Sequence, residues 1–170
     1  LNQKLFEVNF LNDKIIEDPL ETEIVNYLKN IVANYDLVLL SDFGHGFISK
    51  RIYSVIEEKS KLLAVNAQTN AANAGYNLIT KYHNPNFVFL DESEIRLAAQ
   101  SKYGCIDEIA LEMRKQNNAD FLIVTLGKNG SIGVDRNGYI NRNPIFSNKV
   151  IDTIGAGDAF FSYCAPCFST

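Results

Sequence analysis

The chain has 170 residues, of which 46% are hydrophobic and 21% are charged, proportions typical of a globular domain with one buried core. With 16 Lys and Arg residues against 20 Asp and Glu residues, it carries a net charge of −4, and neither sign forms a long block, which argues against nucleic acid or an acidic membrane as a partner. The apolar runs are shorter than the roughly 20 residues that a membrane-spanning helix needs, and the three cysteines favour a reducing compartment, the cytoplasm, over a disulfide scaffold.

A strand and a helix are predicted in the first part of the chain. Apolar side chains at every second position predict a strand over residues 4–11. Asp18 and Pro19 then supply an N-cap and a favourable first helical residue, and Glu21 stands at the capping-box position. The apolar stripe that follows predicts a helix over residues 19–34.

Strands and helices are predicted to alternate along the rest of the chain. The continuous apolar run 37–40 predicts a strand that is buried on both faces. Further strands are expected over residues 62–65, 87–90 and 121–126, and helices after Ser49, over 91–102, over 107–116 and from Gly157 onward. An Asn-Gly signal at residues 136–138 predicts a hairpin between residues 131 and 141. The Asn-rich residues 66–77 are expected to form a solvated loop with some helix; the alternative is that Gln68, Thr69 and Asn70 bind a polar ligand.

This order of elements predicts an α/β fold with a mostly parallel sheet and helices on both faces. Ligands of such sheets bind beyond the carboxyl ends of the strands. Candidate site residues are therefore expected in the turns at 41–46, 91–94, 125–130 and 152–158.

The turn at 152–158 has the residues expected for binding an anion and for accepting a proton. Gly155, Ala156 and Gly157 leave room for a ligand beside a helix N-terminus, where free N–H groups favour an anion such as a phosphoryl group. Asp158 is then well placed to take a proton from a hydroxyl that attacks the phosphorus. The alternative is a structural one, in which the glycines fit a tight turn and Asp158 caps the helix.

With its flanks, this turn resembles the D-T-x-G-A-G-D-x-F signature of the ribokinase-like (PfkB) carbohydrate kinases, and residues 152–160 match at every defined position. Residues 124–130 resemble the V-T-L-G-x-x-G nucleotide loop of that family. Residues 91–94 resemble its N-x-x-E motif, with Asp91 in place of Asn. Residues 41–46 are similar to the S-D-Y-G-K-G turn of the heptose-phosphate kinase branch, with His45 in place of Lys.

The resemblance implies a role for each matching residue. Asp158 would be the catalytic base, and the backbone N–H groups of residues 155–157 would form the anion hole for the γ-phosphate. The nucleotide-binding residues would be Asp91, Glu94, Thr125, Gly127 and Gly130. Glu94 would order Mg²⁺ through water, and Asp152, with the carbonyl of Ile154, would hold a monovalent cation.

The resemblance also implies ATP-dependent phosphoryl transfer to a hydroxyl of a sugar or sugar phosphate, in the manner of the heptose-phosphate kinases. Residues 1–170 would then be one partial, ribokinase-like domain, the middle-to-late part of a kinase, without the N-terminal half and its lid. We expect such a fragment to be inactive alone. The acceptor sugar, the oligomeric state, with a homodimer as one option, and any fused catalytic domain stay open.

Two functions from other classes are the alternatives. Asp91 adds negative charge near the phosphates and His45 replaces a permanent cation, so a non-catalytic nucleotide-binding regulatory or assembly domain is the first. The C-x-P-C spacing of Cys164 and Cys167 suggests a thiol redox module, the second. Their place late in a helix instead favours two buried helix cysteines, with Pro166 bending or ending the helix. His45 and His83 belong to no closely spaced metal-ligand cluster in the sequence and are expected on loops.

Overall fold

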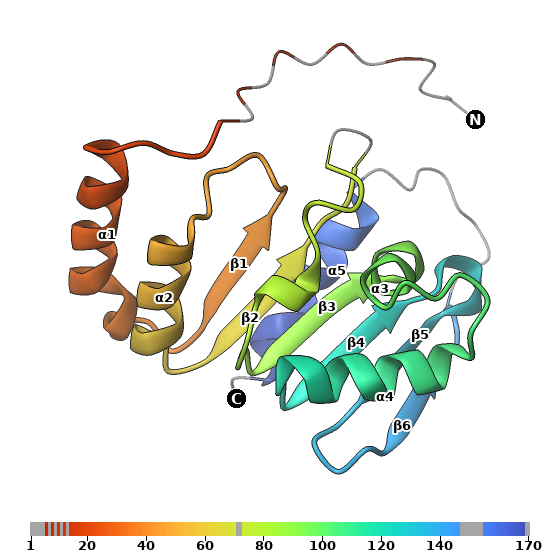
Figure 1. Ribbon diagram of the computed structural model, residues 1–170. Helices are drawn as coiled ribbons and strands as arrows, with labels where there is room; N and C mark the ends of the chain where they lie inside the picture. The colour runs from red at the N-terminus through yellow and green to blue at the C-terminus, as the bar shows by residue number, and fades with distance from the viewer. Residues whose placement is uncertain are drawn as a thin grey trace.

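The structure is a computed structural model that describes residues 6, 8, 10, 12, 14–70, 73–146 and 155–168. A six-stranded sheet in the order β1-β2-β3-β4-β5-β6 forms its centre (Figure 1). The strands are β1 (Val38–Asp42), β2 (Leu63–Ala67), β3 (Phe87–Asp91), β4 (Phe121–Thr125), β5 (Ser131–Val134) and β6 (Ile140–Asn143). β1 to β4 are parallel, and β5 and β6 add an antiparallel hairpin. The mostly parallel sheet and the hairpin were both predicted and are confirmed.

Helices cover both faces of this sheet (Figure 1). They are α1 (Leu20–Ile31), α2 (Lys50–Lys59), α3 (Glu92–Ala98), α4 (Ile106–Asn117) and α5 (Ala156–Cys164), with 3₁₀ turns at Val32–Asn34, Ile79–Lys81, Gly127–Asn129 and Ala165–Phe168. On one face, Ile52 of α2, Ile95 of α3 and Met113 of α4 belong to one buried apolar cluster. On the other face, Phe161 of α5 packs in a second cluster with Phe89. The α/β class with two covered faces is therefore confirmed.

The two predicted helix starts have different outcomes. Ser49 caps α2 as expected, because its side chain accepts a hydrogen bond from the Ile52 N–H at 3.2 Å. The predicted cap at Asp18 is wrong: the N-cap of α1 is Pro19, and Asp18 accepts instead from the hydroxyl of Thr22 at 2.5 Å. Glu21 does not complete a capping box but binds Arg51 of α2 at 2.5 Å. Arg51, a residue distant in the sequence, therefore binds the Glu21 side chain that the capping-box pattern predicted at the N-terminus of the helix.

One predicted strand is not found, and the strand predicted at 37–40 is found as β1 but is not buried on both faces. Phe6, Val8 and Phe10 carry no regular structure and are exposed, so the predicted strand 4–11 is not found at its described residues, and the intervening ones lie outside the description. Alternation alone does not make a strand, since the backbone needs a neighbour for its hydrogen bonds. β1 is an edge strand in the described sheet, and Leu39 is 40% exposed, so burial on both faces is wrong for β1.

The Asn-rich segment is the largest departure from expectation. Among its described residues, 68–70 and 73–77 contain no helix, and Asn66, Asn73 and Asn77 are buried rather than solvated. Buried backbone carbonyls need hydrogen-bond donors, and these amides supply them.

The expected helix 91–102 is also shorter, because α3 ends at Ala98 and Gln100 adopts a left-handed conformation with φ 51°.

No helix in the part of the chain described by the structure is long and apolar enough to cross a membrane.

Candidate active site

A cavity of about 200 Å³ opens at the carboxyl ends of β2, β3 and β4, beside the first turn of α5. Three of the turns singled out in the sequence contribute to its lining, namely those at 91–94, at 125–130 and at 152–158, of which residues 155–158 are described. Its polar and small lining residues include Gln68, Thr69, Glu94, Thr125, Gly157 and Asp158. Residues distant in sequence thus meet where a parallel sheet is expected to hold a ligand.

The start of α5 is built on glycine. Gly155 is the N-cap, with φ 73°, a left-handed conformation that glycine adopts without strain. An added Cβ at Gly157 would meet no atom within 4 Å, so its small size is not required by packing and instead leaves the cavity open. Asp158 lies in the first turn of α5 and accepts a hydrogen bond from the side-chain amide of Gln68. No side chain caps this helix end, so the cap expected at Asp158 in the structural alternative is not found, whereas the tight turn expected at the glycines fits Gly155.

Asp91 and Glu94 form a capping box at the start of α3. The Asp91 carboxylate accepts from the Glu94 N–H, and the Glu94 carboxylate accepts from the Asp91 N–H, both at 2.8 Å. Glu94 also accepts from the Thr69 N–H at 3.1 Å. Burial, together with the negative charges of Asp91 and Asp158, raises the pKa of Glu94 to about 7, although the N–H donors of Asp91 and Thr69 act against the shift.

This shift predicts how stability depends on pH. Since the folded chain binds the Glu94 proton more tightly than the unfolded chain does, the contribution of Glu94 is fully present below about pH 4.5 and is lost as the pH rises through about 7. Relative to Glu94→Gln, the free energy of unfolding of the wild type should therefore fall by about 2 kcal/mol over this window, less than the full shift implies because the carboxylate keeps some solvent contact. Urea titrations of both proteins between pH 4.5 and 8 measure the difference. A constant difference across this range contradicts the assigned shift.

The turn after β4 joins this cavity to a second, larger one. Thr125 pairs with Asp91 across β3 and β4 and lines both cavities. Gly127 and Gly130 follow in left-handed conformations, with φ 55° and 83°. A Cβ on Gly130 would stand 1.9 Å from the carbonyl oxygen of Asn143, so only glycine fits there.

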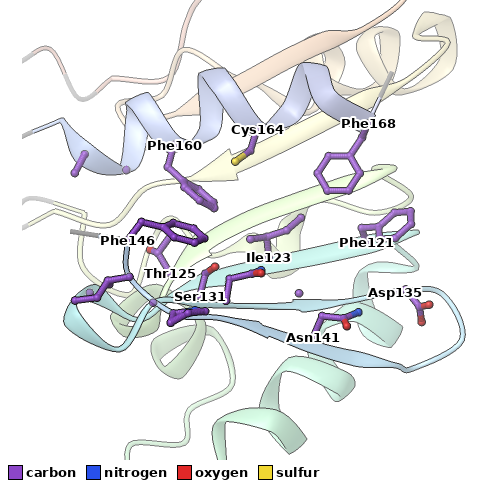
Figure 2. Close-up of a pocket in the computed structure, with 18 residues that line it drawn as sticks. Phe121, Ile123, Thr125, Ser131, Asp135, Asn141, Phe146, Phe160, Cys164 and Phe168 are labelled. Atoms are coloured by element: carbon purple, nitrogen blue, oxygen red, sulfur yellow. The ribbon is translucent and has the colours of Figure 1, made fainter. Parts of the chain in front are cut away.

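The larger cavity, about 730 Å³, lies between α5 and the sheet face of β4, β5 and β6 (Figure 2). Aromatic and aliphatic side chains dominate its lining, with Phe160 and Phe168 on the side of α5 and Phe121 and Ile123 on the sheet (Figure 2). A flat apolar ligand group suits such a cleft. Both cavities share Gly157, so one ligand could reach from the apolar cleft to the start of α5.

The donor set of the smaller cavity suits a divalent cation. Its lining residues include the carboxylates of Asp91, Glu94 and Asp158 and, among the described residues, no Lys or Arg. Oxygen ligands of this kind are what Mg²⁺ prefers, usually with several waters retained. In the described ranges, this cavity included, no group of three or more His, Cys, Asp and Glu residues is placed to hold a metal ion by itself, so a cation here would also need oxygen ligands from water or from a bound phosphate. Asp152 and Ile154, expected at a monovalent cation, lie outside the described residues.

Sequence reasoning gave Gln68 and Thr69 only as a less favoured alternative, yet both line the cavity. The signal for them was their position directly after a buried strand.

His45, in the turn after β1, lies with Nε2 at 3.5 Å from the side-chain nitrogen of Asn70. His83 is exposed on a loop.

The cysteines do not form a redox site of the thioredoxin type. Cys164 lies in the last turn of α5, and burial raises the pKa of its thiol, whereas a redox-active thiol needs a lowered one. Cys167 is exposed, so the expectation that both cysteines are buried is wrong for it. α5 ends before Pro166, as expected.

Comparison with known proteins gives one family. A sequence model of the pfkB family of carbohydrate kinases matches residues 16–165. The chain is similar to the bifunctional protein HldE of Wolinella succinogenes, with 25% identity over 169 residues that cover 96% of this chain and 34% of that protein. It is also similar to the 5-dehydro-2-deoxygluconokinase of Bacillus anthracis, with 36% identity over 56 residues, 33% of this chain and 17% of that protein.

Solved structures give the same fold. Phosphofructokinase-2 from Escherichia coli in complex with potassium superposes with a TM-score of 0.74 at 15% identity, covering 91% of this chain and 50% of that one. Arabidopsis thaliana ribokinase complexed with ribose and ATP superposes with a TM-score of 0.61 at 16% identity, covering 91% of this chain and 47% of that one. The chain therefore spans about a third of the length of HldE and about half of these kinases.

Proposed function

The chain belongs to the pfkB family of carbohydrate kinases, and from this premise we propose that the protein transfers the γ-phosphoryl group of ATP to a hydroxyl of a sugar or sugar phosphate. One observation carries the proposal. Asp158, the first turn of α5 and the Asp91–Glu94 capping box face one cavity, so a proton acceptor, N–H donors for an anion and carboxylates for a cation lie within reach of one ligand.

Asp158 acts as the general base in this proposal. Its carboxylate accepts the proton of the attacking hydroxyl while the oxygen of that hydroxyl forms a bond to the γ-phosphorus and the bond to the leaving ADP oxygen breaks. The free N–H groups of Gly155, Ala156 and Gly157 hold the oxygens of the transferring group, because they point out of the N-terminus of α5. Positioning and electrostatics supply most of the rate in such a transfer.

The nucleotide lies across the two cavities. Thr125, Gly127 and Gly130 line the path of its phosphates, and the apolar cleft beside α5 receives the base. Mg²⁺, when bound, would neutralise charge on the phosphates, and Glu94 would order it through water. We extend the proposal to a monovalent cation at Asp152, for which the potassium complex of phosphofructokinase-2 offers a precedent.

The acceptor is proposed to be a heptose phosphate or a related sugar phosphate. The similarity to HldE over nearly the whole chain supports this branch, as does the turn at residues 41–46. Residues 1–170 are proposed to be one part of a larger kinase domain, with a homodimer as the assembly to test first. The small, odd number of cysteines supports a reducing compartment, the cytoplasm.

Release of ADP that depends on added sugar, measured on the full-length protein with Mg-ATP, tests the function. A heptose phosphate, fructose 6-phosphate and ribose serve as acceptors. We expect turnover with at least one sugar phosphate at the rate typical of kinases, about 1–100 s⁻¹. Binding of ATP without ADP release would favour a regulatory or assembly domain instead.

The effect of Asp91 on nucleotide binding gives a second test. Asp91→Asn should leave the affinity for Mg-ATP unchanged or raise it by up to about tenfold, because the amide removes a negative charge near the phosphates. Stability should be preserved, since Asn caps a helix about as well as Asp. Titration calorimetry measures the affinity. The control is Asp36→Asn, which removes an equal charge from an exposed ion pair with Lys61 ahead of β1. Clear weakening in Asp91→Asn alone would instead make Asp91 a direct ligand of the cation.

A further inference from the structure

Gln68 contacts the proposed catalytic base directly. It follows β2 in the chain, and its side-chain nitrogen Nε2 donates a hydrogen bond to Oδ1 of Asp158, 90 residues away. An ionised carboxylate can only accept hydrogen bonds, so the amide must present its NH₂ group here. The contact joins the segment after β2 to the first turn of α5.

We propose that Gln68 is a positioning residue for Asp158, holding Oδ1 through its amide so that Oδ2 is left to accept the proton of the acceptor hydroxyl. The inference rests on the proposed function of Asp158 as the base. It assigns a role to a residue outside the glycine-rich turn and the capping box.

The backbone of Gln68 is held on both sides, which is what a positioning residue needs. Its N–H donates to the carbonyl of Asp42 at 2.8 Å. Its carbonyl accepts from the side-chain amides of Asn73 and Asn77, both at 3.0 Å. Asn73 and Asn77 are only 4% and 2% exposed, so these bonds are shielded from competing water.

The same asparagines are anchored to the turn after β1. Asn77 also donates to the carbonyl of Asp42 at 2.8 Å, and Asn73 donates to that of Phe43 at 2.6 Å. Asp42 is itself buried and accepts from the hydroxyl of Tyr82 at 2.5 Å. A buried polar network therefore fixes the main chain from which the Gln68 side chain extends, which explains why an Asn-rich segment is packed inside.

A neutral amide suits this position chemically. It donates to a carboxylate without adding positive charge, which would weaken the base, or negative charge, which would repel it. The next residue, Thr69, donates a hydrogen bond to the other carboxylate of the cavity, because its backbone N–H lies 3.1 Å from a carboxylate oxygen of Glu94. Two consecutive residues thus hold Asp158 and Glu94 on separate donors, although both carboxylates line one small cavity.

The test replaces Gln68 in the full-length protein. Gln68→Leu removes the donor at similar size, and Gln68→Glu replaces it with a carboxylate. Because a hydrogen bond to a charged group that orients a base contributes mainly to the chemical step, each variant should lower kcat by about 10- to 100-fold. The KM for ATP should change less than about twofold in Gln68→Leu, whereas the added negative charge of Gln68→Glu should also raise it. The control is Gln116→Leu, an exposed glutamine of α4, which should keep full activity.

A double-mutant cycle separates positioning from a general loss of structure. If Gln68 acts through Asp158, then Gln68→Leu should cost less than about twofold in kcat when Asp158 is already Asn. Equal losses in both backgrounds overturn the inference, as does wild-type kcat in Gln68→Leu or Gln68→Glu. Should Gln68→Leu fail to fold, the near-isosteric Gln68→Glu, checked by its melting temperature, carries the same cycle.

The inference and the proposed function fail differently. Wild-type kcat in both Gln68 variants, with Asp158→Asn impaired, overturns the role of Gln68 and leaves the function intact. Full activity of Asp158→Asn overturns the roles of Asp158 and Gln68 together, whereas the absence of sugar-dependent ADP release from the wild type overturns the proposed function.

Discussion

Asp158→Asn in the full-length protein is expected to lower kcat by about 10²- to 10⁴-fold with little change in ATP affinity. The amide keeps the size of the side chain but cannot take the proton of the acceptor hydroxyl. Binding should survive because backbone N–H groups at the start of α5, rather than this side chain, face the phosphate. Steady-state kinetics with saturating sugar, together with ATP titration, measure both quantities.

The melting temperature of Asp158→Asn should be close to that of the wild type, since Gly155 and not Asp158 is the N-cap of α5. Gly157→Leu is the matched contrast. An added Cβ there meets nothing within 4 Å, so the fold should tolerate leucine, while the longer side chain obstructs the phosphate and weakens ATP binding. Full activity of Asp158→Asn would eliminate Asp158 as the base and, with it, the mechanism proposed above.

Gly130→Ala is expected to destabilise the protein by about 3–5 kcal/mol and to weaken ATP binding. Two costs combine at this position. The backbone has φ 83°, which strains any residue with a side chain, and the new Cβ would lie 1.9 Å from the carbonyl oxygen of Asn143. Relief requires β6 to move away from the turn after β4, and this movement displaces the Gly127–Gly130 turn beside Thr125.

Melting temperature and ATP titration on one preparation measure both effects. Gly133→Ala on the adjacent strand β5 is the matched control for stability, because a Cβ there meets nothing within 4 Å and the backbone is not left-handed. Gly133 lines the apolar cleft, so only the melting temperatures are compared. Gly133→Ala should change stability by less than about 1 kcal/mol. If Gly130→Ala melts with the control, the tight contact between the turn and β6 is not as described.

Much of the fold could be predicted from the sequence because it depends on local chemistry. The hydrophobic run at β4 and the Ser49 cap of α2 require only short-range pattern, and both are found where they were expected. The candidate site was predictable to the same degree. Gly155, Gly157 and Asp158 lie at the start of a helix and line one cavity, as the motif predicts, and their part in binding a ligand stays a prediction.

Other features depend on partners that lie far away in the chain. A pattern of alternating apolar residues at 6, 8 and 10 does not make a strand without a neighbour to pair with. The run at 37–40 is buried on one face only, because β1 lies at the edge of the described sheet. The composition of the first segment fits a strand or an irregular segment, and that of the second fits a strand buried on one face or on both. Hydrogen bonding to neighbouring strands decides between these outcomes.

The role of the Asn-rich segment shows this most clearly. The composition of this segment predicts loop positions for Asn66, Asn73 and Asn77, since asparagine favours turns and contact with water. The tertiary structure buries them because carbonyl groups of Asp42, Phe43 and Gln68 come close enough to accept from the amides. The sequence by itself determined the chemistry of the site, the glycines and carboxylates of its motifs. Only the tertiary structure decided that Gln68 meets Asp158, because hydrogen bonds between residues 90 apart in the chain form only once packing has brought β2 and α5 together.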